Sequence, residues 1–242
     1  MAVGPLAKVV YHPIAGFRLG TTEAGMKVSG RKDLVVMEAQ AGSSMVGVFT
    51  ANAFCAAPVH LCRRHLLSDS PLALVVNTGN ANAGTGLDGE ADAQTCCHEL
   101  AQALNLKSSQ VLPFSTGVIG EKLPIGKIVS SLPKAINALD VNGWEDAALG
   151  ILTTDTRPIF ASFQFLLLGR SISLSVFSKV SVFFLLYSSP IPLYLSISLF
   201  PSSSFFYFFF FFFFFFFFFF FFFFSFFFFS FFFSSSSLSL LI

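Results

Sequence analysis

The chain has 242 residues but no threonine beyond Thr156. From Ser171 to Ile242 it also lacks Asp, Glu, Gly, Asn and Met, and only eight residue types occur: Ser, Ile, Leu, Val, Phe, Lys, Tyr and Pro. A segment without the turn-forming residues Gly and Asn, and almost without charge, does not have the composition of an ordinary globular domain. The chain therefore divides into two unlike parts, a first part at residues 1–158 and a low-complexity hydrophobic tail at 166–242.

An excess of charge of one sign is also missing. The net charge is +1, and all but two of the 14 basic residues and all 13 acidic residues precede residue 159. A nearly neutral first part lacks the basic surface with which proteins bind phosphate backbones. We expect no nucleic-acid partner.

Several common catalytic and metal-binding motifs are absent. There is no GxSxG sequence, and the four histidines make no HExxH or other metal-binding spacing. The cysteines Cys55, Cys62, Cys96 and Cys97 form no CxxC pair. Because no apolar signal segment precedes them, we expect free thiols in a cytoplasmic protein, with no metal and no cofactor.

The tail allows two interpretations. Phe208–Phe224 is unbroken Phe, and the apolar run continues to Phe233 with only Ser225 and Ser230 interrupting it, which is long enough to span a bilayer. Phe, Ser and Leu are also what pyrimidine-rich triplets encode, so a T-rich noncoding tract read in frame gives the same mixture. The sequence favours translated noncoding or misassembled DNA, and a membrane partner is expected only if the tail is made as protein.

Apolar runs in the first part predict strands. The β-rich runs Asp33–Ala39 and Ser44–Thr50, joined by a short turn that contains Gly42, predict a hairpin. Leu72–Val76 and Val111–Phe114 are short apolar runs that predict two further strands.

Helical patterns lie between and after these strands, so the first part is predicted to be α+β. Gly89–Leu106 carries apolar residues at helical spacing. A helix is expected to open at Pro124 and to break or restart at Pro133. A last helix, capped by Asn142, is expected to run to Ile151.

Three of these elements lead into polar motifs. Asn77–Gly86 (NTGNANAGTG) and Ser115–Gly120 (STGVIG) follow the two short strands, and Thr153–Thr156 (TTDT) follows the last helix. The first allows a close backbone approach to a ligand, or is a structural turn cluster. The second offers a hydroxyl and a glycine N–H to a carbonyl oxygen that becomes negative during acyl transfer, or is a capped turn. The third can bind an amide or carboxylate, or simply end a helix. We expect the three to converge on one pocket.

In this order and spacing, the three motifs resemble the glutamate N-acetyltransferase/ornithine acetyltransferase family (ArgJ type) of arginine biosynthesis. The upstream segments GFRLGTTEAGMKVSGRKDLVV and GVFTANAFCAAPV are similar to the N-terminal part of the same family. The likeness covers about residues 14–158 and continues weakly to residue 165.

The resemblance implies a fold, an activity and a set of site residues. The family fold is an α-β-β-α sandwich, and its α- and β-chains combine into a heterotetramer. A precursor cleaves itself before a threonine, which then takes acetyl from N2-acetylornithine and passes it to glutamate to give N-acetylglutamate and ornithine. Close relatives differ in whether acetyl-CoA also serves as donor. By the family's pattern, Thr116 and Gly117 form the oxyanion hole, and Thr153, rather than Thr154, binds substrate.

The chain departs from the family pattern after Pro158. Ile159 stands where the family has Lys, and the later Lys-Gly-x-Gly-Met and Met-Ala-Thr segments are absent. We therefore expect these 242 residues alone not to transfer acetyl groups. Two functions are open: part of an acetyltransferase whose remaining codons lie further along the DNA, or a noncatalytic, membrane-tethered or aggregation-prone α-chain fragment. The first is favoured.

Overall fold

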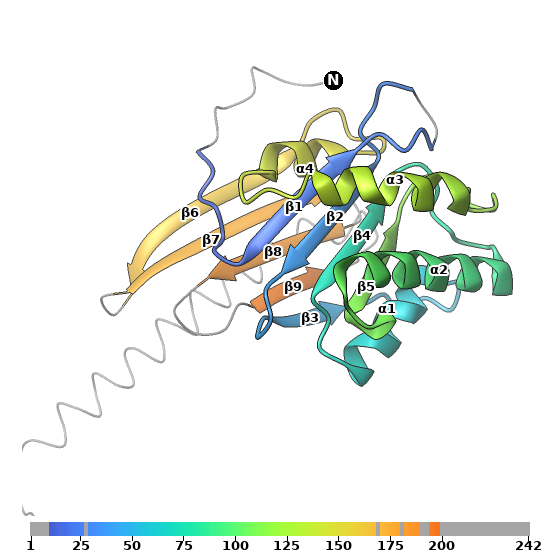
Figure 1. Cartoon of the computed structure of the whole chain (residues 1–242), viewed down its shortest axis with the longest axis horizontal. Coiled ribbons are helices and arrows are strands. Elements are labelled where there is room, and N and C mark those ends of the chain that lie inside the picture. The colour runs from blue at the N-terminus through green and yellow to red at the C-terminus, as the bar shows by residue number, and fades with distance from the viewer. Residues whose placement is uncertain (1–9, 27–28, 168–169, 180–181, 189–193, 199–242) are drawn as a thin grey trace, which may run out of the picture. The chain divides into compact units, whose positions relative to one another are not determined.

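A computed structural model describes residues 10–26, 29–167, 170–179, 182–188 and 194–198, all within one compact unit at residues 1–200 (Figure 1). In chain order its elements are β1 (Phe17–Thr22), β2 (Leu34–Ala39), β3 (Ser44–Val48), α1 (Ala57–Ser68), β4 (Ala73–Asn77), α2 (Gly86–Leu104), a 3₁₀ turn (Ser108–Gln110), β5 (Val111–Ser115), α3 (Ile125–Asn137), α4 (Trp144–Gly150), β6 (Ile159–Leu167), β7 (Arg170–Lys179), β8 (Val182–Ser188) and β9 (Tyr194–Ser198).

Four strands form a sheet, called sheet A, in the spatial order β1-β2-β4-β5. β2 is antiparallel to β1 and to β4, whereas β4 and β5 are parallel. Parallel neighbours need a crossover connection, which α2 provides. The strands predicted at residues 72–76 and 111–114 and the helix predicted at 89–106 are confirmed.

Side chains that alternate along β2 divide between two cores. Leu34 and Val36 pack in one cluster with residues of α2 and α3, whereas Val35 and Met37 pack in a second cluster with residues of α4. Every residue of β4 is buried, as expected for a strand that is covered on both faces. The α+β architecture predicted from the sequence is confirmed.

Helix α3 continues through Pro133 to Asn137, so the predicted break at this proline is wrong. Ile128, Leu132 and Ala135 are buried on one face of the helix, on both sides of the proline. Their packing in the cluster with α2 and sheet A outweighs the loss of one helical hydrogen bond, which costs about 3 kcal/mol in an unsupported helix.

Helix α4 begins at Trp144 with Gly143 in the N-cap position and without a side-chain capping bond, so the predicted cap at Asn142 is wrong. The N–H of Asn142 instead donates to the carboxylate of Asp140 at 2.6 Å. Asn142 therefore belongs to a turn that is closed before the helix begins.

The second sheet, called sheet B, has the order β3-β9-β8-β7-β6. β6 to β9 are antiparallel to their neighbours, and β3 joins β9 in parallel. β7, β8 and β9 lie within the segment 166–242 that the sequence analysis assigned to the tail. Phe160 of β6 and Phe177 of β7 pack against the face of sheet A that is opposite to α2 and α3.

β2 and β3 follow one another in sequence but lie in different sheets, so the predicted hairpin is wrong. A turn closed by the N–H of Ser43 and the carbonyl of Gln40, at 3.2 Å, connects them, with Gly42 at a φ of +88°. Both edges of β2 are already paired, with β1 and with β4. Because no free edge of β2 remains, the chain crosses to sheet B after the turn.

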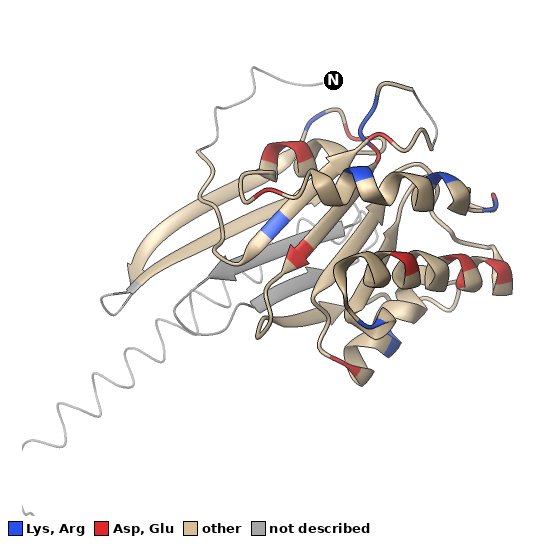
Figure 2. Cartoon of the chain, viewed as in Figure 1, with Lys and Arg blue, Asp and Glu red and all other residues tan. Residues whose placement is uncertain are grey.

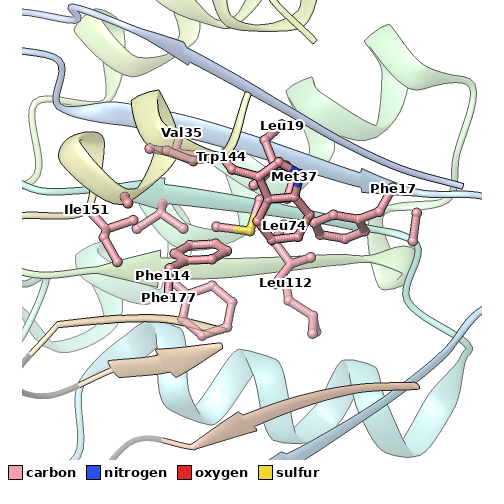
Figure 3. Packing of buried hydrophobic residues seen from close by; sticks show 14 of the residues in the cluster. Phe17, Leu19, Val35, Met37, Leu74, Leu112, Phe114, Trp144, Ile151 and Phe177 are labelled. Carbon is pink, nitrogen blue, oxygen red and sulfur yellow. The ribbon is translucent and has the colours of Figure 1, made fainter. Parts of the chain in front are cut away.

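Trp144 joins the two sheets (Figure 3). Its side chain is fully buried, its ring centroid lies 5.9 Å from that of Phe17 and 6.0 Å from that of Phe177, and Nε1 donates to the carbonyl of Val141 at 2.8 Å. A buried indole whose N–H has a partner combines a large apolar contact with no unsatisfied donor.

The unbroken Phe run at 208–224, and with it the membrane-anchor interpretation, lies outside the described residues. Among the residues that are described, no helix is both long and apolar enough to cross a membrane.

Candidate active site

The polar motifs after β4 and β5 lie side by side because the two strands are parallel neighbours. Asn77, the last residue of β4, is opposite Ser115, the last residue of β5. Asn77 Nδ2 donates to Ser115 Oγ at 2.6 Å, and the N–H of Thr116 donates to the carbonyl of Asn77 at 3.0 Å. Strand pairing thus brings the first two motifs together at the C-terminal ends of β4 and β5.

The loops beyond the strands stay paired through their backbones. The N–H of Val118 donates to Gly79 at 3.4 Å, the N–H of Ala81 donates back to Val118 at 2.8 Å, and the N–H of Gly120 donates to Ala83 at 2.8 Å. The turn at Thr116 therefore packs against the Asn/Gly-rich motif at Asn77–Gly86.

Gly117 occupies the narrowest place between the two loops. Its φ is +140°, and an added Cβ would lie 2.7 Å from the backbone nitrogen of Asn80 and would collide with the backbone of Gly79. A residue with a side chain is strained in that conformation and has no room there. Within the described part of the chain, nothing accepts a hydrogen bond from the N–H of Gly117.

The third motif meets the second through two hydroxyl groups. Thr116 Oγ1 and Thr153 Oγ1 lie 3.4 Å apart, within hydrogen-bonding distance. The neighbouring Thr154 is exposed. Residues from the end of β5 and from the turn after α4 are therefore in contact, so the three polar motifs lie next to one another.

Two side chains that the sequence analysis did not single out hold the turn that carries Thr153. The Arg31 guanidinium donates through Nη1 to the carbonyl of Thr153 at 3.1 Å and through Nη2 to that of Leu152. Thr78 Oγ1 donates to the carbonyl of Gly150 at 3.0 Å. Thr78 lies in the first polar motif, but Arg31 lies more than 100 residues from its partners, in a segment without periodic pattern.

Taken together, these contacts place the Thr116 hydroxyl and the backbone N–H of Gly117 next to one another just after the buried strand β5. Fixed donors of this kind stabilise an oxyanion because they need not reorient during the reaction. Among the described residues, no three His, Cys, Asp or Glu side chains gather as they would to hold a metal ion.

The sequence model of the ArgJ family matches residues 18–182. This chain belongs to the ArgJ family. The resemblance inferred from the motifs is thereby confirmed, and the matched range contains Arg31, Asn77, Thr116, Gly117 and Thr153. It also reaches into the segment assigned to the tail.

Two curated ArgJ-family relatives are similar over most of this chain. It is 50% identical over 179 residues to the arginine biosynthesis bifunctional protein ArgJ of Pseudomonas fluorescens, and 49% identical over 183 residues to the protein of the same name from Methylococcus capsulatus. Each alignment covers 74% of this chain but only 44% and 45% of those proteins. The chain thus spans less than half the length of the curated relatives that it matches.

Solved structures of ArgJ-family proteins have the same fold. The crystal structure of ArgJ from Bacillus halodurans matches with a TM-score of 0.63 and 30% identity, over 69% of this chain and 87% of that chain. Ornithine acetyltransferase from Mycobacterium tuberculosis, in complex with ornithine, matches with a TM-score of 0.59 and 31% identity, over 66% and 82%.

Proposed function

We propose that this chain supplies the oxyanion-binding side of an acetyltransferase of arginine biosynthesis. The enzyme transfers acetyl from N2-acetylornithine to glutamate and so gives ornithine and N-acetylglutamate. Membership of the ArgJ family supports this reaction, as do the names of the relatives and the ornithine bound to the Mycobacterium tuberculosis protein.

In this mechanism a nucleophilic hydroxyl attacks the acetyl carbonyl carbon, and the carbonyl oxygen takes up negative charge. The Thr116 hydroxyl and the Gly117 N–H donate to that oxygen. The C–N bond to ornithine then breaks, and its nitrogen leaves with a proton. The glutamate amine next attacks the acetyl ester through the same oxyanion, the ester C–O bond breaks, and the nucleophile regains its proton. Thr153, beside Thr116, binds substrate.

The nucleophile in this proposal comes from a segment outside the 242 residues. It is a threonine at the N-terminus of the β-chain, whose own α-amino group acts as base. These residues alone are therefore inactive, and they become active with that β-chain in an α-β-β-α sandwich that assembles as a heterotetramer in the cytoplasm. The reaction needs no metal or cofactor, and acetyl-CoA is a second donor to be tested.

The single observation that carries the proposal is the contact between Thr116 and Thr153, which brings the hydroxyl beside Gly117 to the turn after α4. Strand pairing explains why Ser115 lies beside Asn77, but it does not require this second contact. An oxyanion hole and a substrate site in one pocket do require it.

Co-expression with the missing half of a relative tests the function. The full chain is produced with the portion of the Pseudomonas fluorescens protein that begins at the threonine of the family's Met-Ala-Thr segment, and N-acetylglutamate formation from N2-acetylornithine and glutamate is measured. We expect activity from the pair, none from either polypeptide alone, and a loss of about 100-fold or more in the pair with Thr116→Ala, because one oxyanion donor is removed.

The positive control is the Pseudomonas fluorescens protein divided at the same threonine. If the two halves of that protein are active together and the mixed pair is not, the acetyltransferase proposal is wrong and the noncatalytic alternative stands. Activity of the 242-residue chain alone would contradict the missing nucleophile.

The tail is tested at the level of the transcript. Sequencing from the codons for Pro158 to Ile242 and ~1 kb beyond covers a typical second domain of ~100–200 residues. A Lys-Gly-x-Gly-Met and Met-Ala-Thr frame that reappears once the T-rich stretch is removed identifies the tail as noncoding sequence. A mature transcript without that frame supports a chain that needs its β-chain from another gene or has none.

A further inference from the structure

We propose that Asn77 is a positioning residue that sets the geometry of the oxyanion hole, an inference that rests on the proposed function. Asn77 is a polar residue at the end of β4, and only 3% of its surface is exposed. A carboxamide buried at this depth is costly unless its polar atoms have partners. Its carboxamide and its main-chain carbonyl form hydrogen bonds with the two loops that form the site.

Four hydrogen bonds join Asn77 to the two loops. Its Nδ2 donates to Ser115 Oγ at 2.6 Å, which ties β4 to the last residue of β5. Its main-chain carbonyl accepts from the N–H of Thr116 at 3.0 Å. Its Oδ1 accepts from the N–H groups of Gly79 at 3.5 Å and Asn80 at 3.2 Å, both on the loop that directly follows β4.

These bonds fix both sides of the space that Gly117 occupies. On one side, Ser115 and Thr116 precede Gly117 and are bonded directly to Asn77. On the other side, the backbone nitrogen of Asn80 is one of the atoms closest to the position that a Cβ on Gly117 would occupy. A shift of either loop would turn the Gly117 N–H or move the Thr116 hydroxyl relative to the oxyanion.

This arrangement predicts an effect on kcat rather than on substrate binding. Asn77 makes its contacts with the protein scaffold, whereas the donors it aligns act most strongly when the carbonyl oxygen is charged. Displacing such donors by a fraction of an ångström to 1 Å lowers the rate by up to about 100-fold.

Asn82 provides a matched control in the same motif. It is fully buried, its Nδ2 donates to the carbonyl of Gly89 at 2.7 Å, and its Oδ1 accepts from Thr85 Oγ1 at 2.8 Å. These bonds anchor the first turn of α2 instead of the turn at Thr116. Asn82 also has a φ of +47°, so replacing it with Ala disturbs the fold at least as much.

The test uses the full chain co-expressed with the β-chain portion of the Pseudomonas fluorescens protein. With Asn77→Ala we expect kcat to fall by about 10- to 100-fold and the KM for N2-acetylornithine to change by less than about 3-fold. With Asn82→Ala we expect a clearly smaller fall in kcat than with Asn77→Ala, because its side chain bonds to Thr85 and Gly89 and not to Ser115. Ser115→Ala should lower kcat less than Asn77→Ala, and the double variant should be no worse than Asn77→Ala, because both changes remove the same bond.

Hydrogen exchange gives a second measurement that does not depend on activity. Amide exchange in residues 115–120 should become at least about 10-fold faster in Asn77→Ala and be affected much less in Asn82→Ala, which should mainly accelerate exchange in residues 85–90. If the unmodified pair makes no N-acetylglutamate, the proposed function fails, but the exchange measurement still decides the role of Asn77. Unchanged exchange at 115–120, or an equal loss of kcat in both variants, overturns the inference.

Discussion

Sheet A and sheet B differ in how their edge strands are covered. On the outer side of β5, the carbonyl of Pro113 accepts a hydrogen bond from the Cys62 thiol, and the carbonyl of Val111 lies 2.7 Å from His65 Nδ1. On the outer side of β1, Leu19 exchanges two backbone hydrogen bonds with Asp140. Both edges of sheet A are thus closed by other parts of this chain, as soluble proteins require of exposed strand edges.

Sheet B leaves apolar side chains of its edge strand β6 exposed within the described residues. β6 presents Ile159, Phe163, Phe165 and Leu166 to solvent, with exposures of 45% to 78%, and it carries no charged residue. In Figure 2 the charged residues are coloured along the helices, on β1 and β2 and in the loops that connect them. Strands rich in Phe, Ser and Leu pair with one another in sheet B. Covering the edge of β5 in sheet A instead needs specific polar groups, such as those of Cys62 and His65, from another part of the chain.

The largest effect is expected where the two sheets meet, at Trp144. Trp144→Ala should lower the free energy of unfolding by about 3–5 kcal/mol, because it removes a fully buried aromatic side chain that contacts both sheets. Urea unfolding followed by far-ultraviolet circular dichroism measures it, since Trp144 is the only tryptophan and the variant has no indole fluorescence.

Leu87→Ala is the control, because Leu87 is 84% exposed and its loss should change stability by less than about 0.5 kcal/mol. A loss below about 1 kcal/mol for Trp144→Ala would mean that the two sheets are stable without this contact.

The next largest effect tests the tight packing around Gly117, at the C-terminal ends of β4 and β5. Gly117→Ala should destabilise the chain by about 2–4 kcal/mol, because Ala is strained at a φ of +140° and its Cβ meets the backbone of Gly79 and Asn80. Gly126 in α3 has no atom within 4 Å of an added Cβ, so Gly126→Ala should be neutral or stabilising by about 0.5 kcal/mol. Equal effects of the two changes in urea unfolding would show that the slot at Gly117 is not tight.

Some of this fold and site could be predicted from the sequence. The runs that became β4 and β5 are continuous and apolar, and each is followed by a polar turn, so the type and end of each strand could be predicted. The motif order then placed Thr116, Gly117 and Thr153 in one family pattern. Local signals sufficed because these residues sit at the ends of elements.

Apart from the cap at Asn142, which a local turn with Asp140 replaces, the wrong or missing predictions depend on long-range contacts. The turn at Gly42 is a local feature, but whether β3 pairs with β2 depends on β4, which takes the free edge of β2. Pro133 has a poor helix propensity, yet packing of the flanking turns on sheet A decides the outcome. Arg31 has no local signature at all, because its role comes from carbonyls that lie 121 and 122 residues away.

A smaller effect, on the KM, distinguishes the substrate-binding side of the site at Thr153 from the oxyanion-binding side at Thr116 and Gly117. In the active pair, Arg31→Ala should raise the KM for N2-acetylornithine by about 10-fold and leave kcat within about 3-fold, because the two hydrogen bonds lost support the turn of the substrate-binding Thr153. Arg31→Lys should fall in between, since an ammonium group cannot donate as a planar fork.

Arg64→Ala is the matched control for Arg31. Arg64 pairs with Glu90 at 2.6 Å, but half of its side chain is exposed, and surface pairs contribute little. Steady-state kinetics that show a fall in kcat with an unchanged KM for Arg31→Ala would assign Arg31 to the oxyanion side together with Asn77.

The smallest effect concerns the buried thiols of α1 and α2. Burial raises the pKa of Cys62 and of Cys97, and burial together with the nearby charge of Asp92 raises that of Cys96 to about 12. The folded chain keeps these protons, whereas thiols in the unfolded chain ionise with a pKa of about 8.5. This contribution to stability is therefore complete well below that pH and decreases as the pH approaches and passes it. From pH 7 to pH 8 the three thiols together should reduce the free energy of unfolding by only about 0.5 kcal/mol.

Alkylation rates measure the protection of the buried thiols directly. At pH 8, iodoacetamide should modify Cys55, which is partly exposed, well before the buried Cys62, Cys96 and Cys97, because the thiolate is the reactive form and burial both hides it and disfavours it. Peptide mass spectrometry of the folded chain and of the chain in urea gives the four rates. Because Cys62 donates to Pro113 at the edge of β5, rapid labelling of Cys62 without urea would show that this edge opens, and that sheet A is no better closed than sheet B.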